Sequence, residues 1–373
     1  MSPFEVHMTQ EQVEQCQKLC ADFLAGPWQG LKKDEFNCEP IKGGVCNQIF
    51  VCSNKKLESR GTSSVPEKVL VRKYGSPFVG RRGDMISMAD GAVSVVAQIL
   101  YDHGLGPKIF GVFEGGRIEQ FIPNTPIPEE DKTKDEYLAI IMKKFVQIHD
   151  LEMPISKDPY WIFEFTRNWF EEGRTNKFLE VKQDDHLVEQ WRQELLQFSW
   201  REHLEWLKER VPLVDSPEVF THNDMQFPNV FLREGYDTLE EKLFVIDYEN
   251  CSYGFRGYDL AFFIMQKSVD FTKNDFIKYM YWPEKGEREK LVSFFREEYI
   301  IKHGGSEETR DSLDHLMMEV DFFILLMCLM RASIVAKKCC QEMVRMYEFS
   351  HFQIELFHRL KRNLLQDHPF LKN

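Results

Sequence analysis

Three polar residues stand beside two short apolar runs at a spacing that suits phosphoryl-transfer chemistry. Asp224 and Asn229 come just before residues 230–232, and Asp247 comes just after residues 243–246. Two apolar runs joined by a polar loop predict a β-hairpin, which would bring the three side chains to one open end. There one Asp can orient a hydroxyl group and accept its proton, while the Asn and the second Asp hold a metal ion against nucleotide phosphates. Taken singly, each residue is also a common turn former.

The earlier part of the chain contains residues that suit phosphate binding. Gly43 and Gly44 lead into a predicted strand over residues 45–52, and a glycine hairpin can lay backbone N–H groups over phosphates. A glycine pair is equally typical of an ordinary turn. A second strand is predicted over residues 68–74, and residues 104–113 and 117–123 predict a further hairpin. The turn-rich residues 124–128 then mark a boundary between two domains.

Apolar residues at spacings of three and four predict helices over most of the remaining chain. These helices cover residues 11–24, 137–149, 161–178, 186–210, 258–267, 287–303, 312–347 and 349–365. The apolar residues 322–330 are far fewer than the roughly 20 that a membrane span needs, so they predict a buried helix.

Two motifs carry a resemblance to a known family. Residues 222–229 read His-Asn-Asp-x-Gln-x-x-Asn, and residues 246–259 read Ile-Asp-Tyr-Glu-x-x-Ser-Tyr-x-x-Arg-Gly-Tyr-Asp. Together they resemble the choline/ethanolamine kinase family of the protein-kinase-like phosphotransferases, and the resemblance covers most of the chain. It implies an α+β, two-lobed protein-kinase-like fold, with a small β-rich N-lobe and a large, mainly helical C-lobe. The expected domains are an N-terminal helical extension (1–29), a nucleotide-covering N-lobe (30–122) and a catalytic, substrate-binding C-lobe (123–373).

The resemblance also implies a role for each candidate site residue. Asp224 would act as the base, with Asn229 as its catalytic partner. Mg²⁺ would be held by Asp247, Asn229 and Glu249. The nucleotide would be bound by Gly43, Gly44, Asn47, Arg72, Gln120, Ile122 and Gln226. The substrate would contact Asp224, Tyr253, Gln266 and Phe271.

The resemblance also implies structural roles for residues outside the predicted site. Arg256 and Asp259 would form a buried ion pair that buttresses the catalytic loop. His149, near the end of a predicted helix, would cap or pack.

The chain departs from the family at two places. A kinase-like site needs an acid on the helix that follows the Arg72 strand, but Val93 stands there, with Asp90 one turn earlier. In the substrate pocket, Gln266 replaces a family Glu, and Leu329 and Ala332 replace two Trp residues of an aromatic cage. Because each ring contributes roughly 0.5–2 kcal/mol to binding a cation, two lost rings would cost about 1–4 kcal/mol.

Three explanations of this altered pocket stay open. Other aromatic residues can supply the cage, with Tyr253, Phe271, Tyr279 and Trp282 close in sequence. The substrate can instead be ethanolamine or another amino alcohol, held by hydrogen bonds to Asp224 and Gln266. The affinity for choline can also be poor.

The bulk properties narrow the class of protein. A chain of 373 residues, 43% of them hydrophobic, is long enough for two domains. A net charge of −13 argues against nucleic acid or an anionic membrane as the main partner. Nine cysteines without a Cys-x-x-Cys pair favour free thiols in a reducing cytosol. With a polar N-terminus, we expect a cytoplasmic protein without an integral membrane segment, for which a homodimer is compatible.

The predicted reaction is Mg²⁺- and ATP-dependent phosphorylation of choline or ethanolamine, the first step toward phosphatidylcholine and phosphatidylethanolamine. One alternative is a catalytically weak pseudokinase that binds nucleotide or a partner protein, since Val93 and the altered cage weaken two parts of the site. Another is a kinase for a different small amino alcohol, or an aminoglycoside-type phosphotransferase that shares only the residue 222–229 motif.

Overall fold

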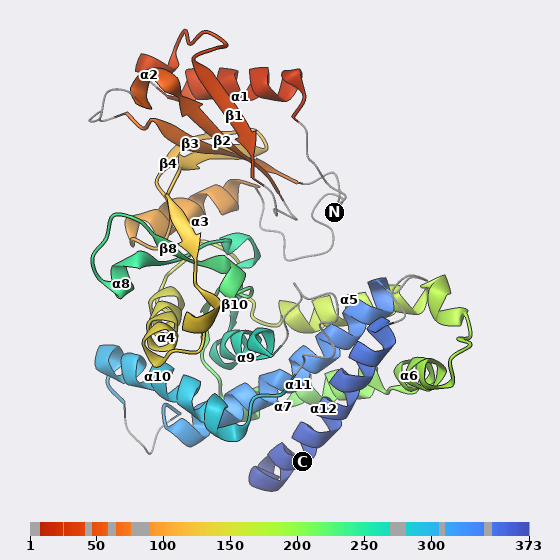
Figure 1. The fold of residues 1–373 in the computed structure, drawn as a ribbon. Helices are drawn as coiled ribbons and strands as arrows, with labels where there is room; N and C mark the ends of the chain where they lie inside the picture. The colour runs from red at the N-terminus through yellow and green to blue at the C-terminus, as the bar shows by residue number, and fades with distance from the viewer. Residues whose placement is uncertain are drawn as a thin grey trace. The chain divides into compact units, whose positions relative to one another are not determined.

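The computed structural model describes residues 8–24, 26–41, 47–58, 65–75, 90–268, 281–305, 310–338 and 345–372 (Figure 1). Gly43, Gly44 and Phe271 lie outside these residues, as does Tyr279. The chain divides into two compact units. Unit 1 comprises Met1–Thr125, Met153–Ile155 and Phe231–Asn250, and unit 2 comprises Pro126–Glu152, Ser156–Val230 and Cys251–Asn373. The segment Phe231–Asn250 thus groups with unit 1, whereas the sequence prediction counts it in the domain 123–373.

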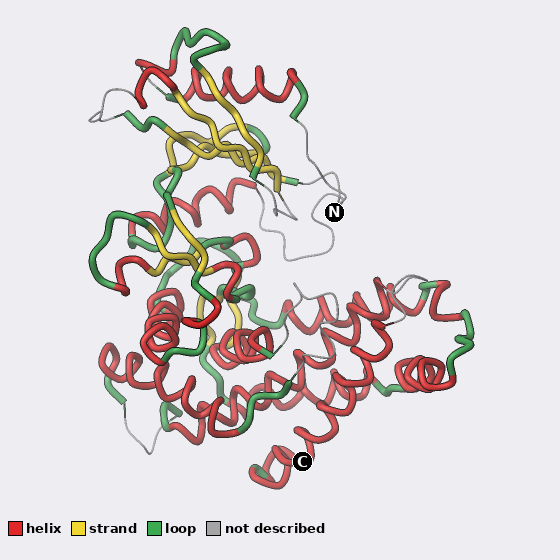
Figure 2. The backbone as a smooth tube through the Cα atoms, in the orientation of Figure 1, coloured by secondary structure: helices red, strands yellow, loops and turns green. Residues whose placement is uncertain are grey.

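Unit 1 contains an antiparallel five-stranded sheet of order β1-β2-β3-β5-β4. Its strands are β1 (Phe36–Pro40), β2 (Asn47–Asn54), β3 (Lys68–Tyr74), β4 (Ile109–Phe113) and β5 (Gly116–Gln120). Figure 2 shows the strands of the chain in yellow. The predicted strand over residues 68–74 is confirmed. Alternation explains why this segment forms a strand, because Val69 and Val71 are buried on one face while Leu70 and Arg72 turn to the other.

One helix of unit 1 packs its cysteine-containing face into the core. Helix α1 (Gln10–Phe23) starts at a capping box of Thr9 and Gln12 and buries Cys16 and Cys20. The unit also holds the short α2 (Lys55–Glu58), α3 (Asp90–Asp102) and a 3-10 helix, η1 (Gly26–Trp28), whose Trp28 is fully buried. The predicted helix over residues 11–24 is therefore confirmed within one residue at each end.

The predicted catalytic hairpin is present. Strands β8 (Val230–Arg233) and β9 (Leu243–Val245) are neighbours in a three-stranded sheet with β6 (Asn124–Pro126), and α8 (Leu239–Lys242) lies in the loop between them. Asn229 ends the 3-10 helix η4 (Phe227–Asn229) directly before β8, and Asp247 comes two residues after β9.

Unit 2 is mainly helical. Its long helices are α4 (Asp135–His149), α5 (Trp161–Arg174), α6 (His186–Gln197), α7 (Trp200–Val214), α9 (Arg256–Lys267), α10 (Lys285–His303), α11 (Leu313–Lys338) and α12 (Arg345–Asp367). Two strands, β7 (Glu218–Thr221) and β10 (Ser252–Phe255), form an antiparallel pair. The single helix predicted over residues 186–210 is wrong, since the extended backbone of Phe198 ends α6 before α7 begins.

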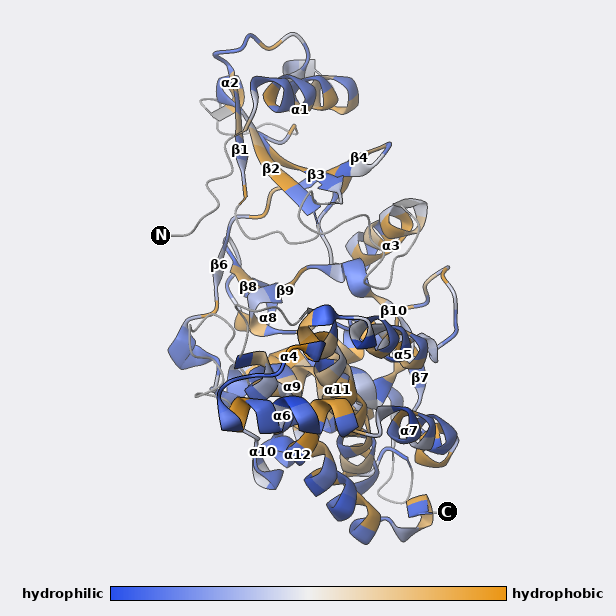
Figure 3. Ribbon diagram, turned by 90° about the vertical axis from the view of Figure 1, so that its right-hand side faces the viewer, coloured by the Kyte–Doolittle hydropathy of each residue, from blue (hydrophilic) through white to orange (hydrophobic). Residues whose placement is uncertain are grey.

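Helix α11 forms the core of unit 2. It packs against α5, α9 and α12, and hydrophobic residues run along it (Figure 3). Residues 322–329 are all almost completely buried, which confirms the predicted buried helix. None of the helices in the described ranges has the length and apolar character that a membrane crossing requires.

Candidate active site

Unit 1 holds a largely apolar cavity of about 400 Å³. Its walls come from β2, β3, α3, β5 and the segment after β9. The apolar lining includes Ile41, Ile49, Leu70, Val93, Ala97, Leu100, Ile122 and Ile246, and the polar lining includes Arg72, Glu119, Gln120, Asp247 and Glu249. A mostly apolar cavity with a few convergent polar groups is typical of a small-molecule site.

Arg72 is held by two carboxylates inside this cavity. Its Nη1 lies 2.6 Å from Glu249 Oε1, and its Nε donates to Glu119 Oε1 at 3.1 Å. Glu119 also accepts from Arg117 Nε at 2.6 Å. On α3, Val93 is 4% exposed and lines the cavity. The acid missing from the Val93 position is therefore replaced by Glu119, on a neighbouring strand, and by Glu249.

Glu119 is a member of this site that our sequence analysis missed. It is 2% exposed, and burial alone would raise its pKa, but the guanidinium groups of Arg117 and Arg72 outweigh burial and lower the pKa to about 2. The signal lay in strand pairing. Arg72 stands directly opposite Arg117 in the β3–β5 register, and Glu119 lies two residues further on the same face.

The other predicted nucleotide residues of unit 1 lie on or next to the cavity. Gln120 and Ile122 line it, whereas Asn47 donates its side-chain amide to Glu249 and accepts from the backbone of Gly75 at 3.2 Å. Asn47 therefore positions Glu249, which in turn contacts Arg72.

The oxygen atoms around the cavity suit Mg²⁺, which prefers carboxylate and amide oxygens. Asp247 lines the cavity from a left-handed backbone conformation, with φ of 69°. Glu249 Oε1 is already hydrogen-bonded by Arg72 and Asn47, so Asp247 is the better ligand of the two. In unit 2, the Nδ2 of Asn229 donates to Asp224. The Oδ1 of Asn229 is therefore the atom that would bind a metal ion.

In unit 2, both side-chain oxygens of Asp224 are oriented by its own loop. Gln226 Nε2 donates to Oδ1 at 3.0 Å, and Asn229 Nδ2 donates to Oδ2 at 3.1 Å and to the backbone oxygen at 2.8 Å. The backbone N–H of Asp224 donates to His222 Nδ1 at 3.2 Å. The structure thus brings Asp224, Gln226 and Asn229 together around one carboxylate.

Asp259 anchors this loop from α9. Its two oxygens accept from the backbone N–H groups of His222 and Asn223, each at 2.9 Å, and from His149 Nε2 at 3.0 Å. Asn223 itself has a left-handed φ of 62°. Burial alone would raise the pKa of Asp259, but the hydrogen bond from His149 and the bonds from the loop outweigh it and lower the pKa.

The predicted Arg256–Asp259 ion pair is wrong. Arg256 binds Glu319 at 2.5 Å and Asp311 at 2.9 Å instead. A fully buried guanidinium needs full charge compensation, and α11 supplies it through Glu319. His149 does pack between aromatic rings, as expected, but its hydrogen bond to Asp259 also gives it a part in anchoring the loop.

Two of the predicted substrate residues, Tyr253 and Gln266, contact cationic side chains of the chain itself. Lys157 Nζ lies 3.7 Å from the centroid of the Tyr253 ring, and Gln266 Oε1 accepts from Arg331 Nη2 at 3.3 Å. Arg331 is 4% exposed, and burial lowers its pKa to about 10. Within the described part of the chain, its Nη1 has no hydrogen-bond partner. Leu329 and Ala332 are fully buried in α11.

Comparisons with known proteins give a consistent result. The sequence profile described as choline/ethanolamine kinase matches residues 38–357. Choline kinase alpha of Mus musculus is 31% identical over 327 residues, covering 82% of this chain and 71% of the mouse protein. Choline/ethanolamine kinase of Homo sapiens is 29% identical over 313 residues, covering 82% and 75%. The crystal structure of choline kinase from Cryptosporidium parvum Iowa II matches with a TM-score of 0.66 at 19% identity, covering 96% of this chain and 99% of that one.

Proposed function

Because the chain belongs to the choline/ethanolamine kinase family and is a kinase, we propose that it transfers the γ-phosphoryl group of ATP to the hydroxyl group of ethanolamine or choline. The product would enter the route to phosphatidylethanolamine or phosphatidylcholine. The observation that carries the proposal is the Asp224 carboxylate, whose two oxygens are oriented by Gln226 and Asn229. The similarity in fold to choline kinase confirms the protein-kinase-like fold that the motifs predict.

The unit 1 cavity would hold ATP. Its apolar walls suit an adenine ring, and Gln120 and Ile122, which line it, would contact the base. Arg72, oriented by Glu119 and Glu249, would contact the phosphates, for which its fixed fork of donors is well suited. Gly43 and Gly44 remain predicted phosphate contacts.

Asp247 and Asn229 would hold Mg²⁺, with Glu249 as a further ligand. Bound Mg²⁺ would neutralise charge on the transferring phosphoryl group. Asp224 would align the substrate hydroxyl and accept its proton as the alcohol oxygen bonds to the γ-phosphorus and the bond to ADP breaks. Gln226 and Asn229 keep the carboxylate in one orientation, so little reorganisation is needed during transfer.

We further propose that ethanolamine, or another primary amino alcohol, is a better substrate than choline. A quaternary ammonium relies on aromatic faces, but the Lys157 ammonium already lies against the Tyr253 ring and donates to its hydroxyl group, and α11 carries Leu329 and Ala332. A primary ammonium instead donates hydrogen bonds to oxygen acceptors and does not depend on aromatic faces.

Steady-state ADP release with Mg²⁺ and a panel of amino alcohols tests both the proposed activity and the proposed preference for ethanolamine. We expect turnover with ethanolamine at a higher kcat/KM than with choline. ATP binding without turnover on any amino alcohol would support the pseudokinase alternative. Turnover on aminoglycosides alone would support the alternative of an aminoglycoside-type phosphotransferase.

Two further predictions belong to the proposal. The cysteines of the described residues are free, which supports the expected cytoplasmic location, where thiols stay reduced. A homodimer stays a prediction, and sedimentation of the purified chain tests it.

A further inference from the structure

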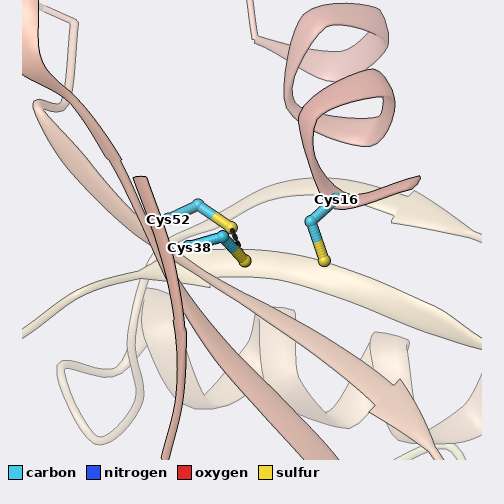
Figure 4. Close-up of side chains that lie close together, drawn as sticks. All are labelled: Cys16, Cys38 and Cys52. Carbon is cyan, nitrogen blue, oxygen red and sulfur yellow. Dashed lines mark hydrogen bonds between the residues drawn. The ribbon is translucent and has the colours of Figure 1, made fainter. Parts of the chain in front are cut away.

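Cysteine thiols from three elements of unit 1 meet in its core (Figure 4). Cys38 on β1 and Cys52 on β2 have sulfur atoms 3.5 Å apart. The sulfur of Cys16, on α1, lies within 4.8 Å of both. Cys16 and Cys52 are fully buried, while Cys38 is partly exposed.

The fold, rather than any spacing in the sequence, creates this cluster. Cys38 and Cys52 stand opposite each other in the antiparallel β1–β2 register. Cys16 lies on the face of α1 that packs into the same hydrophobic core. Cys20 follows one helical turn later on that face, is equally buried, and interacts with Cys52.

We propose that Cys16, Cys38 and Cys52 form a binding site for a thiophilic divalent metal ion of the Zn²⁺ class, with Cys20 as the nearest candidate for a fourth ligand. Zinc–sulfur bonds of about 2.3 Å in a tetrahedral site place the sulfur atoms about 3.8 Å from one another. The observed separations of 3.5 Å and up to 4.8 Å bracket that value. Side-chain adjustments of about 1 Å would therefore bring these three sulfur atoms to the separations of a zinc site.

The surroundings select for this class of ion. Trp28, Phe36 and Phe50 belong to the same buried cluster, so hard ions that need several oxygen ligands are disfavoured. Lys73 lies close enough to Cys16 to interact with it electrostatically, and its Nζ also lies 5.6 Å from the Phe50 ring centroid. Since each ligating thiol gives up its proton, a nearby ammonium group offsets part of the negative charge of the thiolates.

Metal binding would tie α1 to the β1–β2 hairpin. A Cys38–Cys52 disulfide would use only two of the sulfur atoms and leave the approach of Cys16 unexplained. The proposal is independent of the kinase chemistry, because none of the cluster residues lines the unit 1 cavity.

Metal titration of the full chain, reduced and stripped of metal, tests the site. We expect one equivalent of Zn²⁺ to bind, Co²⁺ to give an intense thiolate-to-metal charge-transfer absorption, and the melting temperature to rise with added Zn²⁺. Cys16→Ala and Cys52→Ala should abolish the Co²⁺ absorption. Cys328→Ala removes an equally buried thiol on α11 and should keep it.

Because a cavity at Cys16 can itself unfold the chain, alkylation of the natural protein gives an independent readout. Zn²⁺ should slow maleimide labelling of the partly exposed Cys38 by tenfold or more, an effect that excess chelator reverses. Absence of Co²⁺ charge transfer together with unprotected Cys38 would overturn the proposal and leave the thiols as core packing. Formation of a Cys38–Cys52 disulfide without any metal uptake would overturn it in favour of a redox pair.

Discussion

At the scale of single residues, the site depends on how each charged side chain is held. Asp224 has hydrogen-bond donors on both oxygens, and Arg72 has carboxylates on two sides. Such groups are oriented before substrate arrives, which is the usual basis of electrostatic catalysis. Two substitutions test the two units separately.

Asp224→Asn should remove the proposed base while keeping the size of the side chain. We expect kcat to fall by about 10²–10⁴-fold, the range of general-base contributions, with little change in ATP affinity. Stopped-time ADP assays and ATP titration measure the two quantities. The exposed Asp237→Asn on the following loop is the matched control, and equal losses in both variants would contradict the assignment.

Glu119→Gln should leave Arg72 and Arg117 without their shared carboxylate. Breaking a buried ion pair costs roughly 3–5 kcal/mol of stability, and a misplaced Arg72 should raise the KM for ATP. Glu114→Gln, in the exposed turn before β5, should change neither. An unchanged KM for ATP in a folded Glu119→Gln protein would contradict the role of Glu119.

The effect of Glu119→Gln on stability should also depend on pH. The pKa of Glu119 in the folded chain is about 2, below the ordinary 4.5, so its stabilising contribution is complete above pH 4.5 and is lost as the pH falls toward 2. The difference in melting temperature between natural chain and Glu119→Gln should therefore be largest at neutral pH and shrink below pH 4.5. A constant difference across that range would argue against the lowered pKa.

At the scale of elements, α9 and α4 position the catalytic loop through one buried carboxylate. Asp259 on α9 accepts from two backbone N–H groups of the loop and from His149 at the end of α4. In Asp259→Asn one acceptor oxygen becomes a donor, so the loop should shift.

Because a displacement near 1 Å can cost about 10²-fold in rate, we expect Asp259→Asn to lower kcat by about that factor while ATP affinity changes little. Kinetics at saturating ATP and a separate ATP titration distinguish this outcome from general unfolding, which would reduce both. Asp184→Asn, exposed before α6, is the control.

Tyr253, a predicted substrate residue on β10, contacts Lys157 in the segment before α5. Lys157→Ala should remove the ammonium group that lies against the Tyr253 ring and donates to its hydroxyl, so that a quaternary ammonium can use the ring. A cation–π contact of about 0.5–2 kcal/mol corresponds to a decrease of about 2- to 30-fold in the KM for choline. Choline kinetics check this, with the exposed Lys182→Ala as control. An unchanged KM would remove Tyr253 from the substrate site.

At the scale of the whole molecule, composition bears on association rather than on chemistry. The net charge of −13 attracts small cations over long range, and salt screens that attraction. We expect kcat/KM for ethanolamine to fall as NaCl rises from low to physiological concentration, whereas sucrose at equal osmolality should have no effect. A kcat/KM that is independent of salt would show that the field plays no part in capture of the substrate.

Local sequence determined the parts of this protein that depend on near neighbours. Alternating burial produces β3 over the predicted residues, and a polar loop between apolar runs produces the β8–β9 hairpin. The spacing of Asp224, Gln226 and Asn229 suffices to orient one carboxylate, because all three stand in one short loop. The motifs over residues 222–229 and 246–259 then predicted the protein-kinase-like fold through their resemblance to a known family.

Only the tertiary structure decided which distant side chains meet. Arg72 and Glu119 are 47 residues apart, His149 and Asp259 are 110 apart, and Arg256 takes Glu319 rather than the nearby Asp259. The cluster of Cys16, Cys38 and Cys52 arises in the same way. A buried charged group or thiol interacts with the partner that the packing of strands and helices places next to it. That choice follows from strand register and helix packing, which spacing along the chain does not encode.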